Sequence, residues 1–298
     1  MKLIECVPNF SEGRNENIIQ QITDSITSTG AKVLHIDMGK DTNRTVVTFV
    51  GSPEQVLESA FLSIQKAALL IDMRQHSGTH PRMGATDVCP FVPISNVTMA
   101  ECVVLAQKLA QRVANELQIP TYLYEYAQPN IFRNNLSKIR EGEYEGLFLK
   151  MQMPEWLPDF SAEYNAKSGA TIIGARNFLI AYNVNLNTTS TRRANAVAFD
   201  IREQGRIIKQ QDGTEIRKEG QLKHVKAIGW YLEEQNCAQV SINITNIIET
   251  PIFKVFEACC LSAQQRGLRV TGSELIGLIP KQSLIDAGQY FLHQQQRI

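Results

Sequence analysis

Residues 44–68 read RTVVTFVGSPEQVLESAFLSIQKAA, and this stretch holds the two signals that decide the fold. Its first part, residues 44–50, is rich in Thr, Val and Phe, which is typical of a β-strand. Ser52 then supplies an N-cap, Pro53 the first helical position and Gln55 the third residue of a capping box, so a helix is expected to begin at once. The apolar residues that follow at helical spacing are Val56, Leu57, Ala60, Phe61, Ile64, Ala67 and Ala68. A strand that passes directly into an amphipathic helix predicts an α/β protein with layered helices and sheets.

The same alternation extends to both sides of this stretch. Short apolar runs at residues 3–7, 32–36 and 121–124 are expected to be strands, and residues 15–28 show a helical pattern. A second capping box at residues 98–101 predicts the start of another helix. The first half of the chain therefore approximates βαββαβ with additional pieces.

The second half repeats this order of elements, although the sequence itself shows no repeat. The expected strands are residues 178–186, 224–232, 238–244 and 268–270, and the expected helices are residues 191–202, a helix opened by Thr250-Pro251, and residues 281–292. The polar run 206–221 is expected to form a long loop or a protruding hairpin. A repeated order favours two ferredoxin-like split-βαβ subdomains with helices packed on mostly antiparallel sheets. With the join expected between Gly169 and Phe178, the two subdomains are residues 1–176 and 177–298.

The composition is that of an ordinary globular protein. The 298 residues are 43% hydrophobic, and 30 basic residues balance 30 acidic ones. A net charge of zero gives no global field toward nucleic acid or a membrane surface, so neither is an expected partner. The six cysteines include no C-x-x-C pair and mostly lie in apolar runs, which favours reduced core thiols. The N-terminal residues show no signal-peptide pattern, and no apolar stretch approaches the length of a membrane span, so we expect a cytoplasmic protein.

Residues 76–90, HSGTHPRMGATDVCP, form the densest cluster of chemically useful side chains. Two glycines and two prolines argue against a regular element, and loops on a rigid scaffold often carry binding and catalysis. His80 is compatible with three roles: a general acid–base group that titrates near neutral pH, a metal ligand paired with His76, or an ordinary loop histidine bonded to the backbone. Gly78 and Pro81 disfavour the helix that would place both histidines on one face for a metal.

Other polar segments each have a structural and a functional interpretation. Residues 7–14 precede a helix and either cap it, through Ser11 or Asn15, or present backbone N–H groups to an anion. Residues 37–44 are a polar turn or a place where a carboxylate orients a histidine. Residues 159–174 link the subdomains or contact a flat ligand, and residues 272–277 are expected to be a tight turn. Motifs for a phosphate-binding loop, a dinucleotide site, a nucleophile elbow or zinc are absent from the sequence.

Ordered segments along the whole chain resemble the glutamate formimidoyltransferase family, the formiminotransferase part of the bifunctional formiminotransferase–cyclodeaminase. They are residues 5–13 (ECVPNFSEG), 42–46 (TNRTV), 80–91 (HPRMGATDVCPF), 139–145 (IREGEYE), 174–179 (GARNFL), 228–232 (IGWYL) and 272–280 (GSELIGLIP). The resemblance implies transfer of a formimidoyl group from N-formimidoyl-L-glutamate to tetrahydrofolate, giving 5-formimidoyltetrahydrofolate and L-glutamate in histidine degradation. Tetrahydrofolate is then a co-substrate, and no metal is expected.

The resemblance also assigns site residues, with His80 as the catalytic acid–base residue and the folate enclosed between the two subdomains. We expect Asp37 to orient His80, Arg44 and Arg82 to receive carboxylates, and Asn9 to contact substrate. The stretch that contacts folate in the family corresponds here to Ser161, Ala162, Glu163, Tyr164, Asn165, Ala166, Lys167, Ser168 and Gly169, and it is one residue shorter than in animal enzymes. Glu274 stands where animal members carry glutamine, and a carboxylate there suits an amino or amidino group.

Two further expectations concern partners, and two concern alternative functions. The resemblance implies a homodimer, and a separate cyclodeaminase if the formimidoyl product is made. The nearest alternative is a glutamate formyltransferase that uses 5-formyltetrahydrofolate, because O and NH are nearly the same size. An alternative of another class is a folate-binding protein without catalysis.

Overall fold

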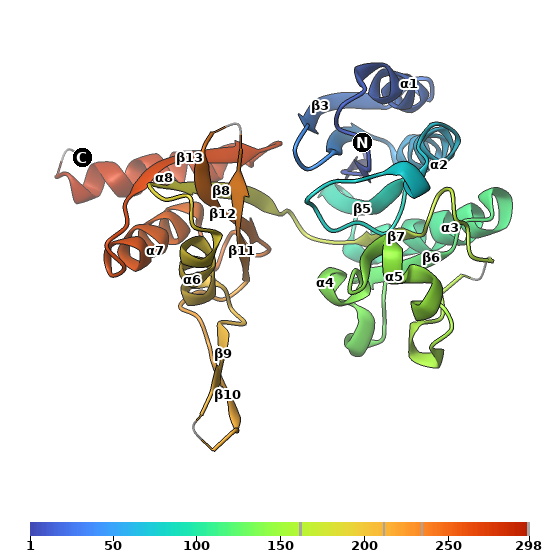
Figure 1. Ribbon diagram of the computed structural model, residues 1–298. Helices are drawn as coiled ribbons and strands as arrows, with labels where there is room; N and C mark the ends of the chain where they lie inside the picture. Colours follow the sequence, from blue (N-terminus) through green and yellow to red (C-terminus); the bar gives the residue numbers. More distant parts are fainter. Residues whose placement is uncertain (161–162, 211, 234, 297–298) are drawn as a thin grey trace. The chain divides into compact units, whose positions relative to one another are not determined.

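The structure is a computed structural model that describes residues 1–160, 163–210, 212–233 and 235–296. The chain divides into two compact units, Met1–Asn177 and Phe178–Ile298, each of which is described by itself (Figure 1). Within the described ranges, none of the helices combines the length and the apolar character needed to cross a bilayer.

In the described part of the first unit, seven strands form one sheet. They are β1 (Leu3–Cys6), β2 (Asn9–Phe10), β3 (Lys32–Gly39), β4 (Arg44–Gly51), β5 (Thr86–Ser95), β6 (Thr121–Glu125) and β7 (Thr171–Ala175). β1 and β2 act as two halves of one strand, because both pair antiparallel with β4 on one side and with β5 on the other. β3 pairs with β4 at one edge, so the order β3-β4-β1/β2-β5 is that of a split βαβ unit. Beyond β5 the sheet continues with β7 and β6, which run parallel to it.

Three long helices pack side by side in the first unit: α1 (Glu16–Thr27), α2 (Pro53–Leu70) and α3 (Met99–Leu117) (Figure 1). The capping box at the start of α2 is confirmed, since the Gln55 N–H donates to Ser52 Oγ and the Ser52 N–H donates to Gln55 Oε1. Two shorter helices, α4 (Leu136–Ile139) and α5 (Glu143–Lys150), help to enclose a second, smaller apolar cluster with Tyr122, Leu147 and Trp156. Short 3-10 turns, η1 (Met73–Gln75), η2 (Ile131–Arg133) and η3 (Pro154–Trp156), complete this unit.

The second unit is built on a four-stranded antiparallel sheet in the order β11-β12-β8-β13. Its elements are β8 (Ile180–Leu186), α6 (Thr191–Ile201), β9 (Arg206–Lys209), β10 (Glu215–Lys218), β11 (Val225–Leu232), β12 (Cys237–Ile244), α7 (Ile252–Gln264), β13 (Val270–Ile276) and α8 (Lys281–Gln294). The apolar core lies between the sheet and the helices α6 and α7. The polar run expected as a loop or hairpin is the hairpin β9–β10, which protrudes from its unit (Figure 1). The order β11-β12-β8-β13 of the second unit repeats the order β3-β4-β1/β2-β5 within the first unit's sheet. The expected α+β fold with two split-βαβ subdomains is therefore confirmed.

Three local expectations are wrong. Residues 272–277 are not a tight turn after a strand at 268–270, because β13 runs from Val270 to Ile276 with an irregularity before Gly272. Residues 86–90 are not loop, because β5 begins at Thr86 and passes through Pro90. Residues 171–174, expected as part of a polar linker, belong to the buried strand β7. In each case pairing with a neighbouring strand outweighs the local preference of Gly, Pro or polar residues.

Candidate active site

The loop that carries His80 is held by backbone contacts on two sides within the first unit. On one side the Asn43 side chain donates through Nδ2 to the Ser77 carbonyl at 2.9 Å. On the other, the Ala85 N–H donates to the Ser168 carbonyl at 2.8 Å, and Gly84 bridges to Gly169. A Cβ on Gly84 would lie 2.4 Å from the nearest carbonyl oxygen, so only glycine permits this approach. The loop is therefore fixed by the surrounding backbone.

His80 is half-buried, and its ring has a defined hydrogen-bond partner. Nδ1 lies 2.7 Å from the carbonyl oxygen of Pro81. A carbonyl only accepts, so Nδ1 carries the hydrogen and Nε2 of the neutral ring has a lone pair. Burial, followed by the positive charges of Arg44 and Arg140, lowers the pKa of His80 to about 3, although Asp87 and the Pro81 carbonyl oppose the shift. The imidazole is thus neutral at physiological pH, with its lone pair on Nε2.

Asp87, at the start of β5, is the carboxylate whose charge acts on His80. It is 0% exposed and accepts hydrogen bonds from Arg44 and Arg140 at 2.5 Å each. Its other oxygen accepts the Met83 N–H at 3.0 Å. Burial alone would raise the pKa of Asp87, but the charges of Arg140 and Arg44 outweigh burial and hold it at about 2. The carboxylate is ionised and anchors the end of the loop.

Asn9 and Arg44, both expected at the site, contact each other. Arg44 Nε and Nη2 donate to Asn9 Oδ1 at 3.0 and 2.7 Å, while Nη1 binds Asp87. Burial lowers the pKa of Arg44 to about 10, with Asp87 acting against it, so the guanidinium stays charged at neutral pH. A substrate carboxylate at Arg44 would compete with these partners, and that role stays a prediction.

Arg82 lies against a cavity of about 460 Å³ lined by His76, Ser77, Gly78, Arg82, Gly142, Glu143 and Glu145. Its guanidinium binds both oxygens of Glu145, at 2.9 and 2.6 Å, and Glu143 at 2.9 Å. Its Nε donates to His76 Nδ1 at 3.2 Å, while His76 Nε2 donates to the Asn43 carbonyl at 2.9 Å. Burial lowers the pKa of His76, so this neutral ring connects Arg82 to the Asn43 carbonyl.

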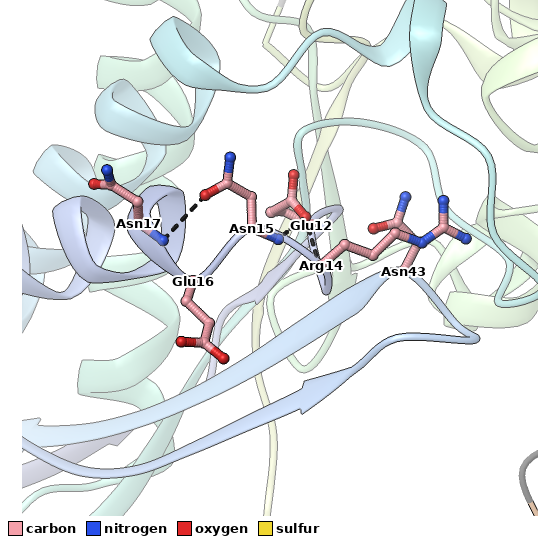
Figure 2. Close-up of a pocket in the computed structure, with 6 residues that line it drawn as sticks. All are labelled: Glu12, Arg14, Asn15, Glu16, Asn17 and Asn43. Carbon is pink, nitrogen blue, oxygen red and sulfur yellow. Dashed lines mark hydrogen bonds between the residues drawn. The ribbon is translucent and has the colours of Figure 1, made fainter.

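A more open depression of about 620 Å³ lies at the start of α1 and is lined by Glu12, Arg14, Asn15, Glu16, Asn17 and Asn43 (Figure 2). Glu12 Oε1 accepts the backbone N–H groups of Arg14 and Asn15 at 2.7 and 2.8 Å. Asn15 Oδ1 in turn accepts the Asn17 N–H, so Asn15 is the helix cap and the structural interpretation of this segment holds. Asn43 connects the two hollows, because it lines this one and bonds to Ser77 of the other.

Of the stretch expected to contact folate, residues 163–169 are described, and they form a turn beside the His80 loop. Ser161 and Ala162 lie outside the described residues. Within the turn, Asn165 Oδ1 accepts the Ser168 N–H and the Asn165 carbonyl accepts the Gly169 N–H. Three residues contact neighbouring elements: Tyr164 packs edge-on against Phe148 at 5.2 Å, the Ala166 carbonyl accepts the Tyr144 hydroxyl, and Lys167 Nζ donates to the Leu69 carbonyl. Glu163 is exposed. The structure therefore brings residues 163–169 against the loop, through Ser168 and Gly169.

Asn9 and Arg44 lie on strands, and so do two further expected site residues. Asp37 is on β3 opposite Val46, and its role toward His80 stays a prediction. Glu274 is an exposed residue of β13, and it accepts a hydrogen bond from Gln239 Nε2 at 3.4 Å. Among the residues that the structure describes, no group of three or more His, Cys, Asp or Glu side chains is arranged to hold a metal ion.

Sequence reasoning missed the roles of Asp87 and Arg140. Asp87 stands in the same loop segment as His80, which was a usable signal. Arg140 lies 53 residues from Asp87, and Arg44 lies 43 residues from it, so nothing local shows that they meet.

Comparison with known proteins finds matches along nearly the whole chain. Residues 3–176 match the family profile described as formiminotransferase domain, N-terminal subdomain, and residues 181–298 match the formiminotransferase domain. A formimidoyltransferase-cyclodeaminase from Gallus gallus is 48% identical over 297 residues, covering 99% of this chain and 53% of that protein. The chain spans about half the length of the formimidoyltransferase-cyclodeaminases it matches.

Shorter relatives match nearly end to end. A glutamate formimidoyltransferase from Thermoplasma acidophilum is 42% identical, covering 98% of this chain and 93% of that protein. One from Streptococcus pyogenes is 40% identical with the same coverage of both chains. With both halves matched in order and such identity over nearly full lengths, this chain belongs to the formiminotransferase family.

Proposed function

We propose that this protein is a glutamate formimidoyltransferase. It transfers a formimidoyl group between N-formimidoyl-L-glutamate and tetrahydrofolate, which gives 5-formimidoyltetrahydrofolate and L-glutamate in histidine degradation. The names of its end-to-end relatives support the reaction. The observation that carries the proposal is the hydrogen bond between His80 Nδ1 and the Pro81 carbonyl, because it leaves Nε2 as a proton acceptor in a loop that is already held in place.

The proposed chemistry needs one group that first accepts a proton and then returns it. Folate N5 attacks the amidine carbon and passes its proton to His80 Nε2, and a tetrahedral intermediate forms. The bond from that carbon to the glutamate nitrogen then breaks, and His80 returns the proton to this nitrogen. General acid–base catalysis of this kind contributes roughly 10²–10⁴-fold. Holding two substrates together supplies much of the remaining acceleration.

The other site residues have proposed roles in binding. Arg82 receives a substrate carboxylate in the 460 Å³ cavity, where the incoming group replaces Glu143 or Glu145 as its partner. Arg44 receives a second substrate carboxylate, Asn9 contacts substrate, and Asp37 orients His80. Residues 161–169 contact the folate, and Glu274 recognises an amino or amidino group.

The wider biological setting is also proposed. Tetrahydrofolate serves as a co-substrate, and the protein uses no metal. It works as a cytoplasmic homodimer whose subdomains are residues 1–176 and 177–298.

The decisive experiment compares two donors with purified protein: N-formimidoylglutamate with tetrahydrofolate, and 5-formyltetrahydrofolate with glutamate. We expect turnover with the first pair. His80→Ala should lower this turnover by roughly 10²–10⁴-fold while folate binding persists. His224→Ala, which removes an exposed histidine paired with Glu249, is the matched control and should keep the rate.

Three outcomes would contradict the proposal. Turnover of the formyl donor alone would identify a glutamate formyltransferase. Tight folate binding without turnover of either donor would identify a non-catalytic folate-binding protein. Near-normal turnover by His80→Ala would remove His80 from the acid–base role.

A further inference from the structure

The cluster beneath His80 buries two positive charges and one negative charge. The side chains of Arg44 and Arg140 are 9% and 13% exposed, and Asp87 is 0% exposed. Buried ions are normally paired one to one, because an unpaired charge in the interior is costly. A surplus positive charge beside a half-buried histidine is therefore a feature that needs an explanation other than stability.

Arg140 makes the more complete contact with the shared carboxylate. Its Nη2 donates to Asp87 Oδ2 at 2.5 Å and its Nε donates to Oδ1 at 3.3 Å, so the guanidinium binds at two points. Arg44 uses one nitrogen on Asp87 and two on Asn9. Arg140 thus has its position set by Asp87 alone among the hydrogen-bond partners of its side chain in the described residues.

The same carboxylate also fixes the backbone of the catalytic loop. Asp87 Oδ1 accepts the N–H of Met83, three residues after His80. Between them, the Pro81 carbonyl accepts the hydrogen on His80 Nδ1. Asp87 therefore holds both the Met83 amide of the loop and the Arg140 guanidinium, and the nearby Pro81 carbonyl fixes the tautomer of the His80 ring.

We propose that Arg140 is a positioning residue for the reaction: docked at two points on Asp87, it holds the carboxylate that bonds the His80 loop at Met83, and it adds a second buried positive charge to this cluster. The charged groups that act on the ring are Arg44 from β4, Arg140 after α4 and Asp87 from β5. Without Arg140, Asp87 and Arg44 would balance each other. The catalytic transfer of a proton to His80 rests on the proposed function, but the protonation state of the ring does not.

The electrostatic balance agrees with this geometry. Burial is the largest cause of the lowered pKa of His80, and the positive charges of Arg44 and Arg140 lower it further. The negative charge of Asp87 raises it. Removal of a like charge at short range raises the pKa of a histidine by about one unit or more. Arg140→Gln should therefore make His80 easier to protonate.

The first test reads the ring directly by NMR on the whole protein with labelled histidine. The chain has five histidines, and His80→Gln assigns the signal of interest. We expect the wild-type ring to be neutral with its hydrogen on Nδ1 down to about pH 4, and the Arg140→Gln ring to begin to protonate about one pH unit higher or more. Identical titrations in both proteins, or a wild-type ring with its hydrogen on Nε2, would overturn the proposal. If Arg140→Gln does not fold, Arg140→Met removes the same charge at similar length.

The second test measures kcat/KM against pH with the proposed substrates. Protonated His80 cannot accept a proton, so the acidic limb should lie at higher pH in Arg140→Gln, with turnover at neutral pH lowered roughly 10- to 100-fold by misplacement of the loop. Arg140→Lys keeps the charge and should restore the position of the limb. An equal loss at every pH would indicate a structural role only and would overturn the proposal.

A matched control removes another buried arginine of the same unit. Arg133 is 9% exposed and pairs with Asp159 at 2.8 Å, away from the charges that act on His80. Arg133→Gln should leave the acidic limb unchanged, and a limb that moves equally in this control would count against Arg140. Failure of the proposed reaction would abolish the kinetic assay but leave the NMR result intact, so the two failures are distinguishable.

Discussion

The two units share a strand order but differ in what they bury. Among the described residues, the buried charged side chains all belong to the first unit: Glu5, Arg44, Arg82, Asp87, Arg133 and Lys150. The buried polar side chains of the second unit are uncharged: Asn183, Gln239, Thr250 and Ser262. The same strand order therefore accommodates buried charged side chains in the first unit and buried uncharged polar side chains in the second.

The difference indicates where chemistry is located. Buried ion pairs add little net stability, because the loss of hydration offsets the Coulomb attraction. The ion pairs of the second unit are less buried, as at Asp200, which is 17% exposed and pairs with Arg206 and Arg266. The fully buried carboxylate of Asp87 in the first unit is therefore better explained by a role at the His80 loop. In the second unit, Trp230 Nε1 donates to Gln239 Oε1 at 2.8 Å and Gln239 Nε2 donates to Asn185 Oδ1 at 2.7 Å, so the network on its sheet is built of amides, with the exposed Glu274 carboxylate at its border.

The largest expected effect comes from breaking the ionic cluster. Asp87→Ala leaves two buried guanidinium groups without their shared carboxylate and should lower the free energy of unfolding by about 3–5 kcal/mol. Urea unfolding followed by circular dichroism measures it. Asp24→Ala on the exposed face of α1 is the control and should change stability by less than about 0.5 kcal/mol. A small, equal change in both variants would show that Asp87 is not needed to balance the arginines.

A smaller effect is expected from pH. The folded-state pKa of Asp87 is about 2, below its ordinary value of 3.8, so the ionised form stabilises the fold above pH 4. This stabilisation, on the order of 2 kcal/mol, is lost as the pH falls from about 4 toward 2. The free energy of unfolding of the wild type should therefore fall more steeply with acid than that of Asp87→Asn. Parallel curves for the two proteins would contradict this linkage.

The smallest effect is expected from breaking the amide network. Gln239 is 1% exposed, and Gln239→Leu leaves the Trp230 N–H and the Asn185 carbonyl oxygen without their partner. We expect a loss of about 1.5 kcal/mol in the unfolding free energy, because a half-buried donor is left unpaired and no buried charge loses its partner. A loss as large as that of Asp87→Ala would remove the contrast between the two interiors.

The fold was largely predictable because its signals are local. The capping boxes at Ser52 and Thr98 act within four residues and mark the starts of α2 and α3. β13 was not predictable in this way, since Gly272 and Ser273 resemble a turn and only pairing with β8 makes them a strand. β5 was hard to predict because it contains Pro90. This proline lies beside the break between β1 and β2, formed by Val7 and Pro8, and its carbonyl accepts the Val7 N–H.

The candidate site was predictable only in part. The His80 loop stands out in the sequence because Gly, Pro and polar residues are concentrated there. The partners of Arg82 and Arg44 depend on which side chains the tertiary fold brings within reach, and the spacing of residues along the chain carries no such information. For the same reason the sequence identifies Asp87 as a loop residue but not as the centre of the cluster.

The glycine contacts of the His80 loop have a consequence for motion. Gly78, Gly84 and Gly169 each place backbone against backbone with no room for a side chain, and the Met83 and Ala85 amides are bonded to buried oxygens. Amides held in this way exchange with solvent only when a large part of the structure opens. The loop therefore belongs to the same cooperative unit as the sheet beneath it, and on heating we expect its geometry to persist until that unit unfolds.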